Sequence, residues 1–295
     1  MYVKELAILM VVHRDADMIN RLTSRLQHPE IDIYIHIDKK TQGLANKIKS
    51  RPNINILPEN ESFDVHWGQN QDNRAVFALI NHSAGNYKHY ALISGQHYPL
   101  KDAESIVQTL HIAPDIDFIT VMEQSSPCYT DFLGRSVLYW PECMIGRNPL
   151  QKALGYIYRN VNKAVNYPLR RKTPRLPSGP FLFGSLWWIL SGRTVDYLHH
   201  TVATNPLILD YYDNCFCADE CIYQTLVSQC PSSIIVNDNL TYIDWSEGKA
   251  SPKLLTEEDY NLLENSNCLF ARKFDSIGSS ELLDRIDSAL LHIAS

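Results

Sequence analysis

Two adjacent basic residues, Arg272 and Lys273, lie between two phenylalanines in the stretch "CLFARKFD", residues 268–275. Arginine offers a planar fork of N–H donors and lysine a compact point charge, so together they can neutralise a doubly charged anion such as a phosphate. The alternative is a solvated cationic pair flanked by packed aromatic rings. The formal net charge of −6 and the absence of a long Lys/Arg run argue against a nucleic acid or an anionic membrane as the partner.

A pair of acids, Asp219 and Glu220, precedes an apolar helical pattern in "CFCADECIYQTL". Acids in a first helical turn cap free N–H groups and complement the helix dipole, a stabilisation of only about 0.3–2 kcal/mol that requires no catalysis. The functional alternative is that one acid caps the helix while the other faces a cleft and acts as a general base. The residues alone leave both interpretations open.

The segment "APDIDFITV" contains Asp115 and Asp117 in D-x-D spacing, by which many sugar-nucleotide transferases hold a divalent cation. The same spacing arises when a loop acid is followed by a strand acid, and we favour this interpretation without a metal. The seven cysteines are an odd number, and the nearest group has C-x-C-x₃-C spacing with no histidine to complete a zinc site. We therefore expect free thiols.

The first third of the chain alternates strand and helix patterns. Residues 6–12 form a continuous apolar run suited to a strand buried on both faces, and Asp15 can cap the helix that follows. Further strands are predicted at residues 31–38, from Ile54 and from Tyr90, with a helix through residues 75–80 before the last of these. Parallel sheets bind ligands at the carboxyl ends of their strands, which places His13, Asp38 and "SGQHYPL" (residues 94–100) along one rim. No G-x-G-x-x-G or P-loop pattern is present.

The rest of the chain has weaker periodicity. Residues 124–180 are rich in proline, aromatic and basic residues and predict a surface region with long loops. A strand is expected at residues 181–190, helices from Gly192, Ala218 and Ser279 or Ser280, and short strands at residues 233–236 and from Leu240. We predict one α/β domain over residues 1–295. No apolar run is long enough to span a membrane, so a cytoplasmic protein is expected, with peripheral membrane association left open.

Five segments in order resemble a known family: "SGQHYPLKD", "FGSLWWILS", "ADECIYQTLV", "YIDW" and "SNCLFARKFD". They are similar to segments of the core-2/I-branching β-1,6-N-acetylglucosaminyltransferases and the related peptide O-xylosyltransferases, and the similarity extends over nearly the whole chain. The resemblance implies a GT-A-like, Rossmann-related mixed sheet flanked by helices. It also implies a UDP-sugar donor, most often UDP-GlcNAc, transfer to a glycan or glycolipid hydroxyl in a β linkage with inversion, and no divalent metal or other cofactor.

The resemblance also assigns roles to residues. Arg272 and Lys273 match the basic pair at the donor diphosphate, and Glu220 matches the general base, with Asp219 as its capping neighbour. For the donor, His13 and Asp38 fall in the uridine region, Trp67 in the tryptophan-glycine segment and Ser185 within "FGSLWWILS". For the acceptor, Glu123, Arg135 and Trp245 occupy the matching positions. The alternatives are a UDP-xylose enzyme and a catalytically silent relative that binds nucleotide sugars or glycans.

Overall fold

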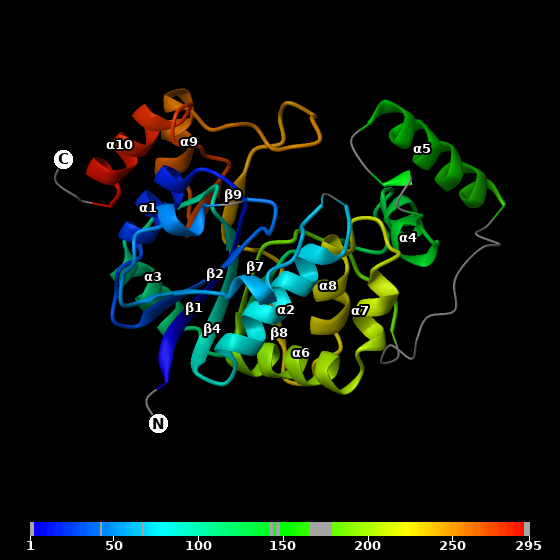
Figure 1. Ribbon diagram of the computed structural model, residues 1–295, viewed down its shortest axis with the longest axis horizontal. Coiled ribbons are helices and arrows are strands. Elements are labelled where there is room, and N and C mark those ends of the chain that lie inside the picture. Colours follow the sequence, from blue (N-terminus) through cyan, green and yellow to red (C-terminus); the bar gives the residue numbers. More distant parts are fainter. Residues whose placement is uncertain are drawn as a thin grey trace.

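A mixed β-sheet forms the centre of the computed structural model, which describes residues 3–41, 43–66, 68–141, 144–145, 148–165 and 179–291. Within this part of the chain the sheet has seven strands in the order β3-β2-β1-β4-β7-β6-β8. Figure 1 shows the sheet between two groups of helices. Strand β7 is antiparallel to both of its neighbours, and the other pairs are parallel. The strands are β1 (Lys4–Val12), β2 (Ile31–Ile37), β3 (Ile54–Ile56), β4 (Tyr87–Ser94), β6 (Ile116–Ile119), β7 (Trp188–Ser191) and β8 (Ile234–Val236).

Strand β1 explains why the sheet is covered on both faces. Its even-numbered residues from Leu6 to Val12 belong to one apolar cluster, and Ala7 and Leu9 belong to another on the opposite face. Successive side chains of a strand point to opposite faces, so a continuous apolar run requires a cover on each side. The expected α/β architecture with a mixed sheet flanked by helices is confirmed.

Helices supply both covers. Helices α1, α3, α9 and α10 contribute buried residues to the cluster that contains Leu6, and α2, α6, α7 and α8 contribute to the cluster that contains Ala7. Asp15 caps α1 as predicted, accepting a hydrogen bond from the backbone N–H of Met18 at 3.0 Å. The helices are α1 (Ala16–Arg25), α2 (Gln71–Ser83), α3 (Ala103–His111), α4 (Tyr129–Val137), α5 (Pro149–Ala164), α6 (Gly192–Thr204), α7 (Leu207–Tyr212), α8 (Ile222–Val227), α9 (Tyr260–Glu264) and α10 (Ser280–Ala289).

A second, three-stranded sheet has the order β5-β10-β9 and consists of β5 (His97–Pro99), β10 (Phe270–Arg272) and β9 (Thr241–Ile243). Phe270 and Phe274 are fully buried, so the two aromatic residues that flank the basic pair anchor it in the core. The register places Arg272 opposite His97 of β5. Because β5 follows β4 after two residues, the basic pair lies close to the carboxyl end of β4.

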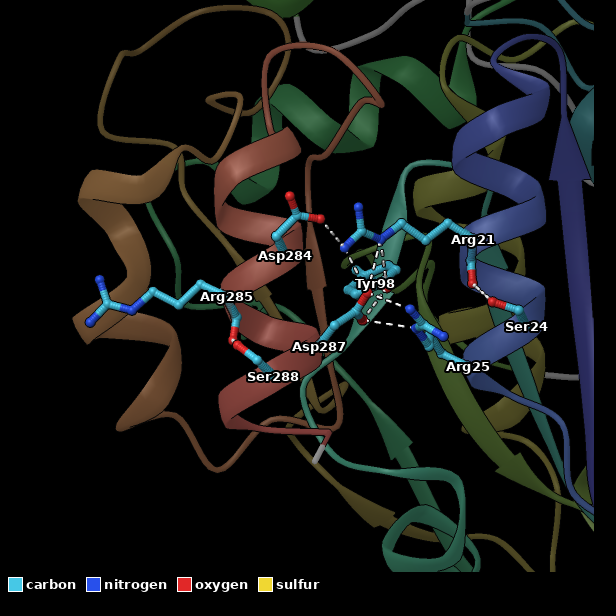
Figure 2. Close-up of polar contacts among 8 residues, drawn as sticks. All are labelled: Arg21, Ser24, Arg25, Tyr98, Asp284, Arg285, Asp287 and Ser288. Atoms are coloured by element: carbon cyan, nitrogen blue, oxygen red, sulfur yellow. Dashed lines mark hydrogen bonds and ion pairs between the residues drawn. The ribbon is translucent and has the colours of Figure 1, made fainter. Parts of the chain in front are cut away.

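An ionic cluster fixes the C-terminal helix against this region (Figure 2). The carboxylate of Asp287 on α10 accepts hydrogen bonds from Arg21 and Arg25 of α1 and from the hydroxyl of Tyr98 on β5. These donors hold the pKa of Asp287 below its usual value, although its burial acts in the opposite direction. Removing one partner from a buried ionic cluster is costly in stability. Because Tyr98 belongs to β5 and β5 pairs with β10, the cluster also supports the strand that carries Arg272.

Two expectations about secondary structure are wrong in part. Residues 181–187 are not a strand, because their backbone bonds elsewhere: the carbonyl of Phe183 accepts from Met122, and Gly184 donates to Glu220. Residues 124–180 are not only loops, since they contain α4 and the sixteen-residue helix α5. Asn148 caps α5 and Pro149 opens it, a start signal that the sequence displays.

Candidate active site

The carboxyl ends of three parallel strands bring the predicted donor residues together. His13 follows β1, Asp38 follows β2 and Ser94 ends β4. The backbone N–H of Asp38 donates to the carbonyl of Val12 at 2.8 Å, and its buried carboxylate lies 3.5 Å from the ammonium of Lys40. Burial and the positive charge of Arg14 lower the pKa of His13, while Asp38 opposes that shift. His13 and Asp38 thus share one rim, as the sequence predicts.

Arg272 is held as a partly buried cation at the same rim. Its guanidinium carbon lies 4.4 Å from the ring centroid of Trp187, and one terminal nitrogen donates to the Ser94 hydroxyl at 3.4 Å. The buried Nε has no hydrogen-bond acceptor, and no carboxylate of the described residues lies within 4.0 Å of the guanidinium. Burial lowers the pKa of Arg272 to about 10, which leaves it protonated at neutral pH. An uncompensated buried cation is costly, and a bound anion would remove that cost.

His97 forms the wall next to Arg272. Its Nδ1 accepts a hydrogen bond from the backbone N–H of Ser94 at 3.0 Å, and its ring packs edge-on against Trp187 with centroids 4.4 Å apart. Burial and the charge of Arg272 hold the pKa of His97 well below its usual value. The imidazole is therefore neutral and adds no second charge at this wall.

Lys273 joins the site to a surface loop. Its ammonium donates to the Ser251 hydroxyl at 3.0 Å, and its carbonyl accepts from the backbone N–H of Leu255. The same loop begins after β9 and contains Trp245, which is exposed as an acceptor-stacking residue would need to be. The structure thus connects the predicted phosphate-binding lysine to the loop with the predicted acceptor tryptophan.

Glu220 lies in a 3₁₀ turn (Ala218–Glu220) before α8, where Arg135 of α4 binds its carboxylate at 2.5 Å. The Arg135 guanidinium carbon lies 4.0 Å from the ring centroid of Phe132 and 5.6 Å from that of Phe216. Burial raises the pKa of Glu220, and Arg135 offsets part of the rise. A carboxylate with a raised pKa is suited to accept a proton near neutral pH.

The predicted capping role of Asp219 is wrong. Helix α8 begins at Ile222 with Cys221 at its N-cap, and no side chain caps it. Burial, together with the nearby carboxylates of Asp72 and Glu220, raises the pKa of Asp219 well above its usual value. Burial also raises the pKa of Asp72 to about 7, with Glu220 adding to the shift. Sequence reasoning missed Asp72, because its proximity to Glu220 depends on how α2 packs beside the 3₁₀ turn.

One short segment touches both halves of the site. The backbone N–H of Gly184 donates to the carbonyl of Glu220 at 2.9 Å, and three residues later Trp187 packs on Arg272. Residues 184–187 therefore connect the turn that carries Glu220 to the aromatic ring that holds the Arg272 guanidinium. Gly184 is required here, since a Cβ atom would lie 1.8 Å from the carbonyl oxygen of Thr120.

The other predicted site residues are placed less centrally. The backbone carbonyl of Ser185 accepts a hydrogen bond from the Gln224 side chain at 2.6 Å. Its hydroxyl accepts one from the backbone N–H of Trp187 at 3.3 Å. Glu123 is exposed and accepts from Ser125. Arg135 binds Glu220, and its predicted contact with the acceptor stays a prediction. Trp67 lies outside the described residues.

The D-x-D carboxylates are occupied by protein partners. Asp117 is fully buried and accepts from the backbone N–H of Ser191 and from the hydroxyls of Thr194 and Ser233, at 2.6–2.8 Å. Asp115 is exposed and pairs with Arg193 at 2.6 Å. Asp117 therefore anchors the start of α6, and the interpretation as a strand acid fits this geometry. The six cysteines among the described residues are free thiols, as expected.

We expect Asp117→Asn to destabilise the protein without removing a reacting group. An amide has one acceptor oxygen, so at least one of the three donors loses a charged acceptor, at a cost of about 1–3 kcal/mol in the free energy of unfolding. Thermal melting should show a lower Tm, while activity well below the Tm stays near that of the wild type. A folded variant that has lost activity, regained with added manganese, would instead identify Asp117 as a metal ligand.

The carboxyl edge of this α/β sheet thus carries a partly buried cation without a carboxylate partner among the described residues, and one segment connects it to a carboxylate of raised pKa. The family described as "Branch: Core-2/I-Branching enzyme" matches residues 6–265. The chain belongs to this family, and the resemblance drawn from the five sequence segments is confirmed.

Curated relatives carry names of two different transferase activities. The chain is 25% identical to beta-glucuronosyltransferase GlcAT14B of Arabidopsis thaliana over 94% of this chain and 64% of that protein. It is 20% identical to xylosyltransferase 2 of Rattus norvegicus over 96% of this chain and 33% of that protein. It thus spans less than two thirds of these relatives. Among solved structures, apo mouse xyloside xylosyltransferase 1 aligns with a TM-score of 0.37 and 9% identity over 90% of this chain and 97% of that chain.

Proposed function

We propose that this protein is an inverting glycosyltransferase that moves a sugar from a UDP-sugar to an acceptor hydroxyl in a β linkage without a divalent metal. The observation that carries the proposal is Arg272, a partly buried guanidinium without a carboxylate partner among the described residues, packed on Trp187 in the segment whose Gly184 binds the Glu220 turn. Family membership supports a nucleotide-sugar donor and a glycan or glycolipid acceptor. We assign the binding of uridine to His13 and Asp38 at the strand ends, and their shared edge of the sheet supports this assignment.

In the proposed reaction Glu220 removes the proton from the acceptor hydroxyl as that oxygen attacks the anomeric carbon of the donor. The bond between this carbon and the β-phosphate oxygen breaks on the opposite face, and UDP leaves with the electron pair. The diphosphate gains negative charge in the transition state, so Arg272 and Lys273 stabilise that state more than the bound substrate. Arg135 orients the Glu220 carboxylate through the 2.5 Å ion pair.

GlcNAc remains our first candidate for the transferred sugar, with xylose and glucuronic acid as alternatives suggested by the names of the relatives. The purified chain should be incubated separately with UDP-GlcNAc, UDP-xylose and UDP-glucuronic acid, with and without EDTA. We expect one donor to raise the Tm and to release UDP at a rate that EDTA leaves unchanged. Stabilisation without UDP release, across a panel of glycan acceptors, would identify a silent binder. Loss of UDP release in the presence of EDTA, followed by recovery when manganese is added, would refute metal independence.

A further inference from the structure

Helix α5 exposes a continuous apolar stripe. Its members recur at helical spacing of three or four residues, and their exposed fractions lie between 40% and 66%: Leu150, Leu154, Ile157, Val161 and Val165, the last at the C-cap. Residues three and four apart lie on one face of a helix. A soluble helix normally turns such a face toward the core, so the stripe requires a partner outside the described part of this chain.

A different face of α5 attaches it to the protein. Gly155 and Asn162 are buried, the hydroxyl of Tyr158 donates to the carbonyl of Tyr139 at 2.7 Å, and Lys163 pairs with Asp131 of α4 at 2.7 Å. Figure 1 shows α5 beside α4, well away from the central sheet. The apolar stripe is therefore not the surface by which α5 packs on the rest of the described structure.

The charge around α5 is strongly one-sided. Residues 148–165 contain Lys152, Arg159 and Lys163 and no Asp or Glu, in a chain whose net charge is −6. A second copy of the chain packed on the stripe would bring two cationic segments together, which is unfavourable. An anionic lipid surface would attract the same segment and accept the apolar side chains, and amphipathic basic helices bind such surfaces lying in the interface plane.

We propose that α5 docks this protein on an anionic lipid bilayer, with the apolar stripe facing the acyl chains. This departs from the expectation drawn from the whole chain's composition, because the positive charge is local. None of the helices within the described residues is long and apolar enough to cross a membrane, so the contact is peripheral.

The position of α5 links this docking to the candidate site. Trp140 packs edge-on against Tyr158 of α5 with ring centroids 5.5 Å apart, and it also packs against the ring of Phe216 with centroids 5.1 Å apart. Phe216 in turn lies against Arg135, the partner of Glu220. A pocket of about 240 Å³ lies between α5 and Phe216, and its lining includes Trp140, Tyr156 and Phe216. If the proposed function holds, the acceptor that fits this arrangement is a glycan carried on a lipid.

Co-sedimentation with vesicles tests the docking without any donor or acceptor. We expect the protein to bind vesicles that contain phosphatidylglycerol, to bind pure phosphatidylcholine much more weakly, and to be released by high salt. The double variant Ile157→Asp, Val161→Asp should lose about tenfold or more of the binding, because it places two charges at the apolar boundary. Lys152→Glu should weaken binding about fivefold or more through the charge alone.

Ile112→Asp is the matched control, because Ile112 is an exposed apolar residue at the end of α3. It should bind vesicles like the wild type, and the stripe variants should keep the wild-type Tm and transfer to a soluble acceptor. Equal binding by the double variant, or no preference for anionic vesicles, would refute the proposal. A dimer in analytical ultracentrifugation that the double variant abolishes would assign the stripe to a second copy instead. Vesicle binding without transferase activity would refute only the proposed function.

Discussion

Glu220→Gln is expected to slow sugar transfer by about 10²–10⁴-fold, the contribution that general-base catalysis usually makes, while donor affinity changes little. Glutamine preserves the shape of the side chain, and its amide oxygen can still accept from Arg135, but it cannot take up a proton. Transfer rate, UDP affinity and Tm should be measured on the same preparation, so that a loss of activity is separated from unfolding.

The pH dependence of transfer should carry the same signature. Burial raises the pKa of Glu220, and a base works only when it is ionised, so the rate should fall as the pH is lowered through this raised value. In Glu220→Gln this acid limb should disappear from the residual rate. A residual profile with an unchanged acid limb would assign that limb to another group.

Asp219→Asn is the matched control for Glu220→Gln. The pKa of Asp219 is raised well above its usual value by burial and by two neighbouring carboxylates, which favours the neutral acid. Asparagine resembles that neutral form, so folding and rate should both be nearly retained. Normal turnover by Glu220→Gln, or a strong loss in Asp219→Asn alone, would move the base to another acid, and Glu123 is the next to test.

Arg272→Met is expected to lower kcat by about 10²–10³-fold, comparable to the loss of one donor that stabilises transition-state charge. The ligand-free variant should be at least as stable as the wild type, because methionine keeps a contact with Trp187 but removes a partly buried cation without a carboxylate partner in the described structure. UDP should raise the Tm of the wild type much more than that of the variant. Activity and stability thus change in opposite directions.

Lys273→Ala tests the second cation of the basic pair, and a variant of an exposed lysine elsewhere serves as its control. Lys273→Ala should lower kcat by about 10²-fold, since it removes the second cation from the leaving group. Lys249→Ala is the control, because Lys249 is an exposed cation that pairs with Glu247 at 3.0 Å. Unchanged turnover in both Arg272→Met and Lys273→Ala would show that the basic pair has no role at the diphosphate.

The sequence by itself determined the parallel strands of the first third of the chain and where they end. The apolar run at residues 6–12 can be satisfied only by burial on both faces, so β1 was predictable, and the acids and histidine after β1 and β2 had to share one edge. Phe270 and Phe274 flank the basic pair in the sequence, and both side chains are buried in the core. The alternation of strands and helices is a local property, and hydrophobic periodicity records it directly.

Only the tertiary structure decided what each polar residue contacts. Asp115 and Asp117 have the spacing of metal ligands, yet one pairs with Arg193 and the other anchors α6, because β7 and α6 approach from later in the chain. Arg135 binds Glu220, 85 residues away, a pairing that the sequence did not indicate. Residues 181–187 have strand propensity but do not form a strand. The backbone N–H of Gly184 donates to the carbonyl of Glu220, and the ring of Trp187 packs on the Arg272 guanidinium. Partners distant in sequence leave no periodic signal, so the fold had to be known before the site could be assembled.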